Sequence, residues 1–181
     1  MGSGVSGLYA GTYGANAATN GVGEGKQSQP FSDSYGVTRD MLEYERQRGV
    51  YSEERGYDLN PTTVEARNNI RDGVLVDHEG SPMDGTYTYA VREDGTLVIG
   101  KRNGNGRDGK ATPHPTLVGG RNPRVRIAGI VTMSKGKIVK YDNESGHFKP
   151  NILSMTEADR AFSELPITAF HRNFRKNMGR R

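Results

Sequence analysis

Two histidines, each in a loop braced by glycine and proline, are the side chains of this sequence best suited to chemistry. His147 lies in NESGHFKP, residues 143–150, and His114 lies in ATPHPTLVGG, residues 111–120. Glycine and proline fix the backbone around a titratable ring without filling a core. An imidazole titrates near neutral pH and can exchange a proton with a substrate or hold its hydroxyl group. We predict that NESGHFKP ends a strand and presents His147 to a cleft whose other wall is the His114 loop.

The residues after His114 favour a negatively charged ligand. Gly119 and Gly120 let the backbone approach a ligand closely, and Arg121 and Arg124 supply positive charge nearby. The sequence contains no GxGxxG at a strand-to-helix turn, no P-loop, no HExxH and no EF-hand loop. Residues 101–181 also hold only six acids, which is few for a metal-dependent nuclease. We therefore expect no metal site.

The charge of the chain is divided unevenly along its length. Residues 1–100 carry 8 Lys and Arg against 15 Asp and Glu, a net charge of -7, whereas residues 101–181 carry 17 against 6, a net charge of +11. Such a basic half attracts nucleic acid, nucleotide phosphates or an acidic protein partner, for example an immunity protein or a chaperone. The alternative is a solvated surface whose charge the acidic half balances.

Composition sets further limits. The chain has no cysteine, which excludes disulfides, thiolate zinc sites and a cysteine nucleophile. No apolar run approaches the roughly 20 residues of a membrane span, so no transmembrane segment is expected. The start MGSGVS fits an N-myristoylation signal, which would place a lipid anchor on Gly2, although a tag or an excised domain boundary gives the same pattern.

The chain divides into a tail and one domain. Residues 1–29 are rich in Gly, Ala, Ser, Thr and Asn with almost no large apolar residue, and they predict a flexible tail or linker. Residues 30–181 are expected to form a single domain with a modest core, because only 33% of the chain is hydrophobic.

Apolar spacing and turn residues predict the elements of that domain. Helices are expected at 38–48, from Asn60-Pro61 to Gly73, at 154–165 and at 167–178. Two hairpins are expected, one turning at Asp94-Gly95 and one at Lys135-Gly136. The predicted fold class is therefore α+β: a small, bent antiparallel sheet of two hairpins with N-terminal and C-terminal helices.

Residues 87–150 resemble a domain of bacterial secreted toxins and effectors that is also similar to plant calmodulin-binding IQ-motif M proteins. The shared pattern is an aromatic strand with a DG turn, then His followed by L-x-x-G, then AG on a strand, GKI, and SGHY-x-P. Here these pieces read YTYAVREDGTLVI, HPTLVGG, RIAGIVTMSKGKIV and NESGHFKP. Three positions depart from the pattern, since Pro115 replaces Ser, Ile130 replaces an acid and Phe148 replaces Tyr.

The resemblance implies a secreted bacterial protein that acts in the cytoplasm of a target cell. Some toxins of this group resemble unconventional ADP-ribosyltransferases, so it also implies NAD as cofactor and a protein or RNA as substrate. In that interpretation His147, His114 and Glu144 are catalytic, with Glu144 one of three acids, besides Asp142 and Glu164, that could stabilise an oxocarbenium-like centre. The residues expected to contact NAD are Ser145, Gly146, Phe148, Tyr89, Gly119, Gly120, Arg121 and Arg124.

Two other interpretations stay open. A metal-independent ribonuclease toxin would use the histidine pair as general base and acid, with the basic half gripping RNA. A non-catalytic interaction module would use SGHFKP as a structural corner, with His147 hydrogen-bonded inside the protein and Phe148 packed in the core.

Overall fold

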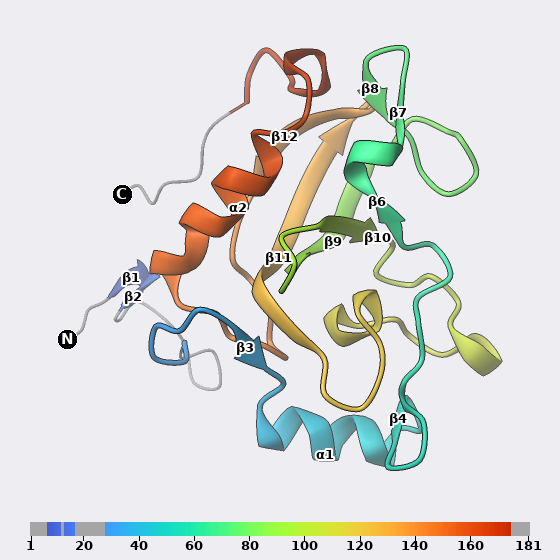
Figure 1. Ribbon diagram of the computed structural model, residues 1–181, viewed down its shortest axis with the longest axis vertical. Helices are drawn as coiled ribbons and strands as arrows, with labels where there is room; N and C mark the ends of the chain where they lie inside the picture. Colours follow the sequence, from blue (N-terminus) through green and yellow to red (C-terminus); the bar gives the residue numbers. More distant parts are fainter. Residues whose placement is uncertain (1–6, 12, 17–27, 175–181) are drawn as a thin grey trace.

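The computed structural model describes residues 7–11, 13–16 and 28–174, and its centre is a six-stranded antiparallel sheet (Figure 1). The two longest strands, β9 (Gly85–Arg92) and β11 (Arg124–Ser134), pair with each other in the middle of this sheet. Both are rich in β-branched and aromatic residues, which favour a pleated, buried strand.

Each central strand also pairs with the partner of its own hairpin. β10 (Leu97–Gly100) returns from β9, and β12 (Lys137–Tyr141) returns from β11. Gly95 has a φ of +91°, and the second turn has two residues with positive φ, Lys135 at +50° and Gly136 at +82°. Glycine adopts this backbone conformation without strain. Both predicted hairpins are confirmed.

Short strands complete the sheet and the loops around it. β6 (Val64–Glu65) pairs with β10, and β3 (Tyr35–Gly36) pairs with the start of β11. In the described part of the chain, three separate two-stranded pairs lie outside the sheet. They are β1 (Gly7–Gly11) with β2 (Tyr13–Asn16), β4 (Tyr51–Ser52) with β5 (Gly56–Tyr57), and β7 (Ile70–Arg71) with β8 (Val74–Leu75).

Side chains alternate between the two faces of the sheet, and each face has its own core. One face is covered by α2 (Met155–Phe162), which lies across it in Figure 1. The other face is covered by η3 (His114–Leu117), a 3-10 turn, and by residues near Tyr35 and Phe148. Tyr89 belongs to the first core and its neighbour Ala90 to the second, because successive residues of a strand point in opposite directions.

The predicted fold class is wrong in its helical part. The chain is mostly sheet, and the described residues contain two α-helices, α1 (Arg39–Gln47) and α2. Both are short, and α2 continues directly from a 3-10 turn, η4 (Ile152–Ser154). The described chain is thus one larger antiparallel sheet with two short helices, not a small sheet between N-terminal and C-terminal helical portions.

The helix predicted from Asn60-Pro61 to Gly73 is absent. The Asn60 side chain accepts hydrogen bonds from the backbone and the hydroxyl of Thr62 and donates to Lys101 O, so it forms a buried turn instead of a helix cap. The chain then runs through β6, η1 (Ala66–Asn68), β7 and β8. The pairing of β6 with β10 at the edge of the sheet outweighed the helix start predicted at Asn60-Pro61, because tertiary contacts often override local helix propensity.

The helix predicted at 167–178 is also wrong over the residues described there. η5 (Ile167–Ala169) is a single 3-10 turn, and Phe170 is already extended, with φ -110° and ψ 134°. Phe174 stacks on the Tyr141 ring with centroids 5.8 Å apart, so the aromatic residues cover the first core without a helix. Residues 175–178 lie outside the described part, as do Gly2 and most of the predicted tail, 1–29.

Candidate functional site

The stretch NESGHFKP forms a tight, hydrogen-bonded turn after β12. The Asp142 side chain accepts the backbone N–H groups of Ile130 and Glu144, each at 2.9 Å. Ser145 closes the turn twice, because its Oγ accepts from Phe148 N and its carbonyl from Lys149 N. Lys149 takes a φ of +43°, which leads the chain out of the turn. The turn therefore fixes the backbone at His147.

His147 meets a carboxylate from a distant part of the chain. Its Nε2 lies 2.6 Å from Oε2 of Glu45, a residue of α1, and its carbonyl accepts the N–H of Thr38 just before that helix. Only 11% of the His147 side chain and 6% of the Glu45 side chain are exposed. Glu45 is the one buried residue of α1, so a carboxylate and not an apolar side chain anchors this helix.

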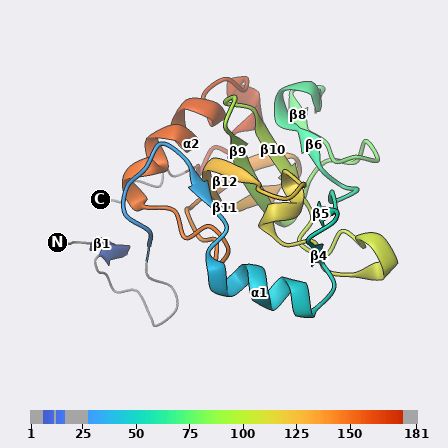
Figure 2. The ribbon, with the colours of Figure 1, turned by 60° about the horizontal axis from the view of Figure 1, so that its bottom comes forward.

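Glu45 could not be predicted as a site residue, because the apolar residues of the helix indicated a different inner face. The helix at 38–48 was predicted from its apolar spacing, which includes Met41 and Tyr44, yet Tyr44 is 47% exposed. Figure 2 shows α1 along the lower edge of the molecule beside β4 and β5. The low apolar content of the helix was the one signal that its inward position could be polar.

His114 is held inside the protein by the central strand. It opens η3, and its Nε2 lies 2.8 Å from the carbonyl oxygen of Gly129, to which it donates. Burial lowers the pKa of His114 to about 4, against the opposing effect of the Gly129 hydrogen bond; the charges of His147 and Arg102 lower it further. His114 is therefore neutral at pH 7, and His147 lies near enough to affect its pKa.

Both rings lie in the interior and not across an open cleft, and they are near enough for the charge of His147 to lower the pKa of His114. His114 is 6% exposed and His147 is 9% exposed. They come from a 3-10 turn on one side and a strand-end turn on the other, and both have their Nε2 atoms engaged by groups of the protein. The cluster of His114, His147 and Glu45 is called the histidine cluster below.

Gly129 lets β11 pack closely against the backbone that follows β12. A Cβ atom at this position would lie 1.9 Å from the carbonyl oxygen of Asp142, which is backbone and cannot swing away. The Tyr89 hydroxyl donates to the same carbonyl. Burial raises the pKa of the Asp142 carboxyl to about 6, although its two backbone hydrogen bonds oppose that change.

Replacing Gly129 by alanine is expected to lower the free energy of unfolding by about 1 to 3 kcal/mol, because the added methyl group forces β11 and the Asp142 backbone apart. Gly146→Ala is the matched control, since no atom lies within 4 Å of a Cβ built there. Urea unfolding measures both. Equal stability of the two variants would show that the sheet relaxes freely at Gly129.

The two aromatic residues proposed to stack on nicotinamide lie on opposite faces of the sheet. Tyr89 packs edge-on against Phe162 in the core under α2, whereas Phe148 packs with Tyr35 and Leu117 in the other core. Both side chains are completely buried, at 0% exposed. They cannot form one surface for a ligand, and neither ring presents a face to solvent.

The other predicted site residues scatter around the cluster. Gly119 and Gly120 have φ of +79° and +87°, and Gly120 pairs with Tyr57 through two backbone hydrogen bonds. Arg124 binds the hydroxyl and carbonyl of Ser34, so it braces the β3 edge. Ser145 closes the His147 turn as described above. Three residues, Gly146, Glu144 and Arg121, are exposed.

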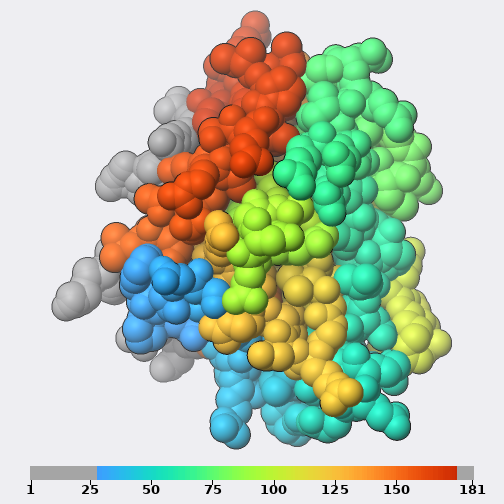
Figure 3. All heavy atoms as spheres, viewed as in Figure 1, coloured from blue at the N-terminus to red at the C-terminus, as the bar shows by residue number. Residues whose placement is uncertain are grey.

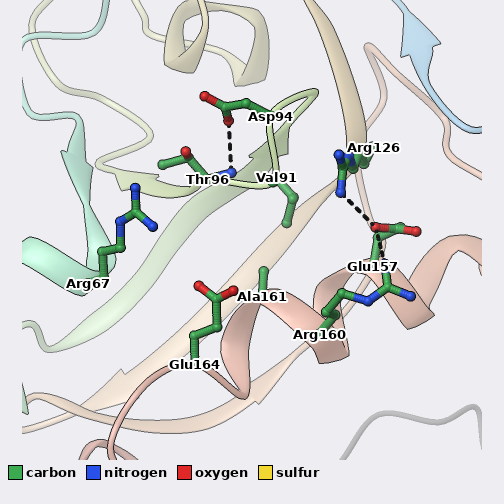
Figure 4. A pocket seen from close by; sticks show the side chains of 10 residues that line it. Arg67, Val91, Asp94, Thr96, Arg126, Glu157, Arg160, Ala161 and Glu164 are labelled. Carbon is green, nitrogen blue, oxygen red and sulfur yellow. Dashed lines mark hydrogen bonds and ion pairs between the residues drawn. The ribbon is translucent and has the colours of Figure 1, made fainter.

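A charged pocket of about 280 Å³ lies away from the histidine cluster, where α2, the β9–β10 turn and the segment near Arg67 meet (Figures 3 and 4). Glu157 accepts from both Arg126 and Arg160 along one wall, as Figure 4 shows. These charges largely neutralise each other. Of the residues that the sequence assigned to a site, the pocket contains only Glu164, one of the three candidate acids.

Two features of the described residues concern cofactors and membranes. No group of three or more His, Asp or Glu side chains in residues 7–11, 13–16 and 28–174 is arranged to hold a metal ion. In the same part of the chain, neither helix has the length and apolar character needed to cross a membrane.

The fold and the cluster define an antiparallel-sheet domain with a buried carboxylate–imidazole pair beside a second, neutral imidazole. A search of protein families finds no match to this chain, and searches of curated proteins and of solved structures find none either. The chain's own geometry is therefore what bears on its function.

Proposed function

We propose that this chain is an effector-type domain that transfers ADP-ribose from NAD to a protein or RNA, with the Glu45–His147 pair at its centre. The observation that carries the proposal is the 2.6 Å contact between Glu45 Oε2 and His147 Nε2, next to the neutral ring of His114. Titratable groups with buried partners gather at functional sites more often than elsewhere. A structural corner alone needs no carboxylate in the interior.

Glu45 takes the role that sequence analysis gave to Glu144. In the transfer, the bond between nicotinamide and ribose C1′ breaks with its electron pair leaving on nicotinamide, and a nucleophile of the macromolecule bonds to C1′. A carboxylate beside C1′ stabilises the positive charge that develops there. Glu45 is held in a low-dielectric environment where this effect is large, whereas Glu144 is exposed and only its backbone is bound.

Access to the cluster would come from movement of α1. Apart from Glu45, the helix has no fully buried side chain, and Leu42 supplies its contact with the small apolar cluster of Val50, Tyr51 and Tyr57. Elements with few buried apolar contacts open at low free-energy cost. In the proposed cycle α1 opens to admit NAD and closes with Glu45 over the ribose, which excludes water from the reaction.

The test is transfer of label from radiolabelled NAD to macromolecules of a cell lysate. The wild-type protein is expected to label a protein or RNA band, and Glu45→Gln to reduce the rate by about 100-fold because it removes the charge but keeps the shape. Glu144→Gln is the matched control, expected to act like wild type. Lack of labelling by wild type, or full activity of a folded Glu45→Gln protein, contradicts the proposal.

The ribonuclease interpretation is less well supported by the geometry. A general base works best when its pKa lies near the operating pH, and a ring with a much lower pKa is a weak base there. His114, with a pKa of about 4, is neutral there and has its Nε2–H committed to Gly129.

A non-catalytic interaction module is the second candidate, and the burial of Phe148 and Tyr89 favours it. In this alternative the cluster only ties the turn to α1 and β11. Part of the positive charge of the second half is neutralised by acids of the first half, because Arg107 pairs with Asp58 and Lys149 with Asp40. Failure of labelled NAD to transfer, together with a partner recovered at low salt and lost at high salt, is the outcome this candidate predicts.

A further inference from the structure

Tyr57 stands beside the histidine cluster and is held there by the backbone. It ends β5, donates its N–H to Gly120 O at 2.8 Å and accepts from Gly120 N at 3.0 Å, which ties it to the loop that follows His114. Gly56 allows this contact, since a Cβ there would lie 2.1 Å from the Gly120 carbonyl carbon. The Tyr57 ring packs on Tyr51 with centroids 5.0 Å apart.

The hydroxyl of Tyr57 is buried and makes no hydrogen bond to any residue in the described part of the chain. The residue is 2% exposed. Leu42 of α1 packs against the cluster that contains Tyr57, and Glu45 lies one turn further along the same helix. Burial raises the pKa of this phenol, and the nearby charge of Glu45 raises it further. Buried tyrosine hydroxyls nearly always have a partner, and an exception calls for an explanation.

We infer that the Tyr57 hydroxyl and the Glu45 carboxylate together form a subsite for a sugar hydroxyl of the ligand. The inference rests on the proposed function for the choice of a ribose. A ligand oxygen here must accept a hydrogen bond from Tyr57 while lying near a negative charge. A sugar hydroxyl satisfies both groups, because it accepts from the phenol and donates to the carboxylate. A phosphate oxygen would be repelled by Glu45 and has no proton to donate.

The test measures binding of ADP-ribose, which contains the sugar but cannot undergo the transfer, by isothermal titration calorimetry. Tyr57→Phe removes one oxygen atom and keeps the ring. We expect it to weaken ADP-ribose binding at least about 10-fold, the usual loss when a buried hydrogen bond to a ligand is removed. Tyr44→Phe is the matched control, since that side chain is 47% exposed, and it should bind as wild type does.

A second readout separates a ligand-facing hydroxyl from a structural one. Because the Tyr57 hydroxyl has no partner among the described residues, its removal should leave the Tm of the free protein unchanged or raise it. A clear fall in Tm for Tyr57→Phe would show that the hydroxyl stabilises the fold, and would overturn the inference. Unchanged ADP-ribose binding in that variant overturns it as well.

Failure of the subsite and failure of the proposed function give different results. In one outcome the wild-type protein binds ADP-ribose, the Tyr57→Phe variant does not, and the wild-type protein labels nothing with NAD. The subsite is then correct and the proposed transfer is wrong. If labelling occurs and Tyr57→Phe binds ADP-ribose normally, the transfer stands and the subsite is wrong. If ADP-ribose does not bind to wild type at all, the subsite is wrong in either case.

Discussion

Replacing Glu45 by alanine is expected to lower the free energy of unfolding by about 1 to 3 kcal/mol, the loss typical when one partner of a buried hydrogen bond is left unsatisfied. The reason is that His147 would keep a ring nitrogen in the interior with no acceptor, in a pair now only 6% and 11% exposed. The apolar contacts of α1 are too few to hold the helix in place without this carboxylate. Thermal and urea unfolding followed by circular dichroism measure the change.

The matched control lies on the same helix. Glu43 pairs with Arg46 at the surface, and its side chain is 55% exposed, so Glu43→Ala should change stability by less than about 1 kcal/mol. A double-mutant cycle measures the interaction energy between Glu45 and His147. His147→Ala and Glu45→Ala together should cost much less than the sum of the two single changes, because the double variant leaves no buried polar group unpaired. Additive single effects would show that the two side chains act independently.

This coupling affects how activity data should be interpreted. A loss of activity in His147→Ala cannot be assigned to chemistry alone, since the same change leaves the Glu45 carboxylate buried without its partner. The conservative change Glu45→Gln, with stability measured in parallel, separates the two effects.

Replacing Asp142 by asparagine is expected to stabilise the protein by about 2 kcal/mol above pH 7. The variant is also expected to lose stability as the pH falls, unlike the wild-type protein. In the native protein the Asp142 carboxyl has a pKa of about 6, raised from 3.8. A raised carboxyl pKa means that the folded state favours the protonated form, so its contribution is full below pH 3.8 and is lost as the pH rises through 6. Asparagine keeps the acceptor oxygen for Ile130 and Glu144 and has no charge to bury.

His114 changes the stability with pH in the direction opposite to Asp142. Its pKa falls from 6.5 to about 4 on folding, so the unfolded chain binds the proton first. The neutral ring therefore contributes stability that is full above pH 6.5 and is lost as the pH falls toward 4, by about 3 kcal/mol. In the wild-type protein the two effects largely cancel between pH 4 and 6.5.

Unfolding free energies measured from pH 4 to 8 test this balance. The wild-type curve should carry little slope from these two groups, Asp142→Asn should become less stable as the pH falls, and His114→Gln should become more stable. Glu144→Gln serves as the control for the Asp142 variant, because its side chain is exposed. Parallel curves for Asp142→Asn and wild type would show that this carboxyl has an ordinary pKa.

The sequence by itself determined the two hairpins at the centre of the sheet. The turns at Asp94-Gly95 and Lys135-Gly136, with alternating apolar residues on both sides, are local signals that act over a few residues. It also placed helices near 39–47 and 155–162, and it singled out His114 and His147 as residues held by their loops.

Only the tertiary structure decided the rest, because the deciding contacts join residues far apart in the chain. Asn60 lies in a turn and not at a helix start, because its side chain hydrogen-bonds to the backbone of Lys101 and Thr62. Tyr89 and Phe148 ended on opposite sides of a sheet whose faces the sequence could not assign. The carboxylate of the histidine cluster came from Glu45, 102 residues before His147. Pattern within a segment specifies which strand or turn forms there, whereas the partners of a buried polar group depend on how the segments pack together.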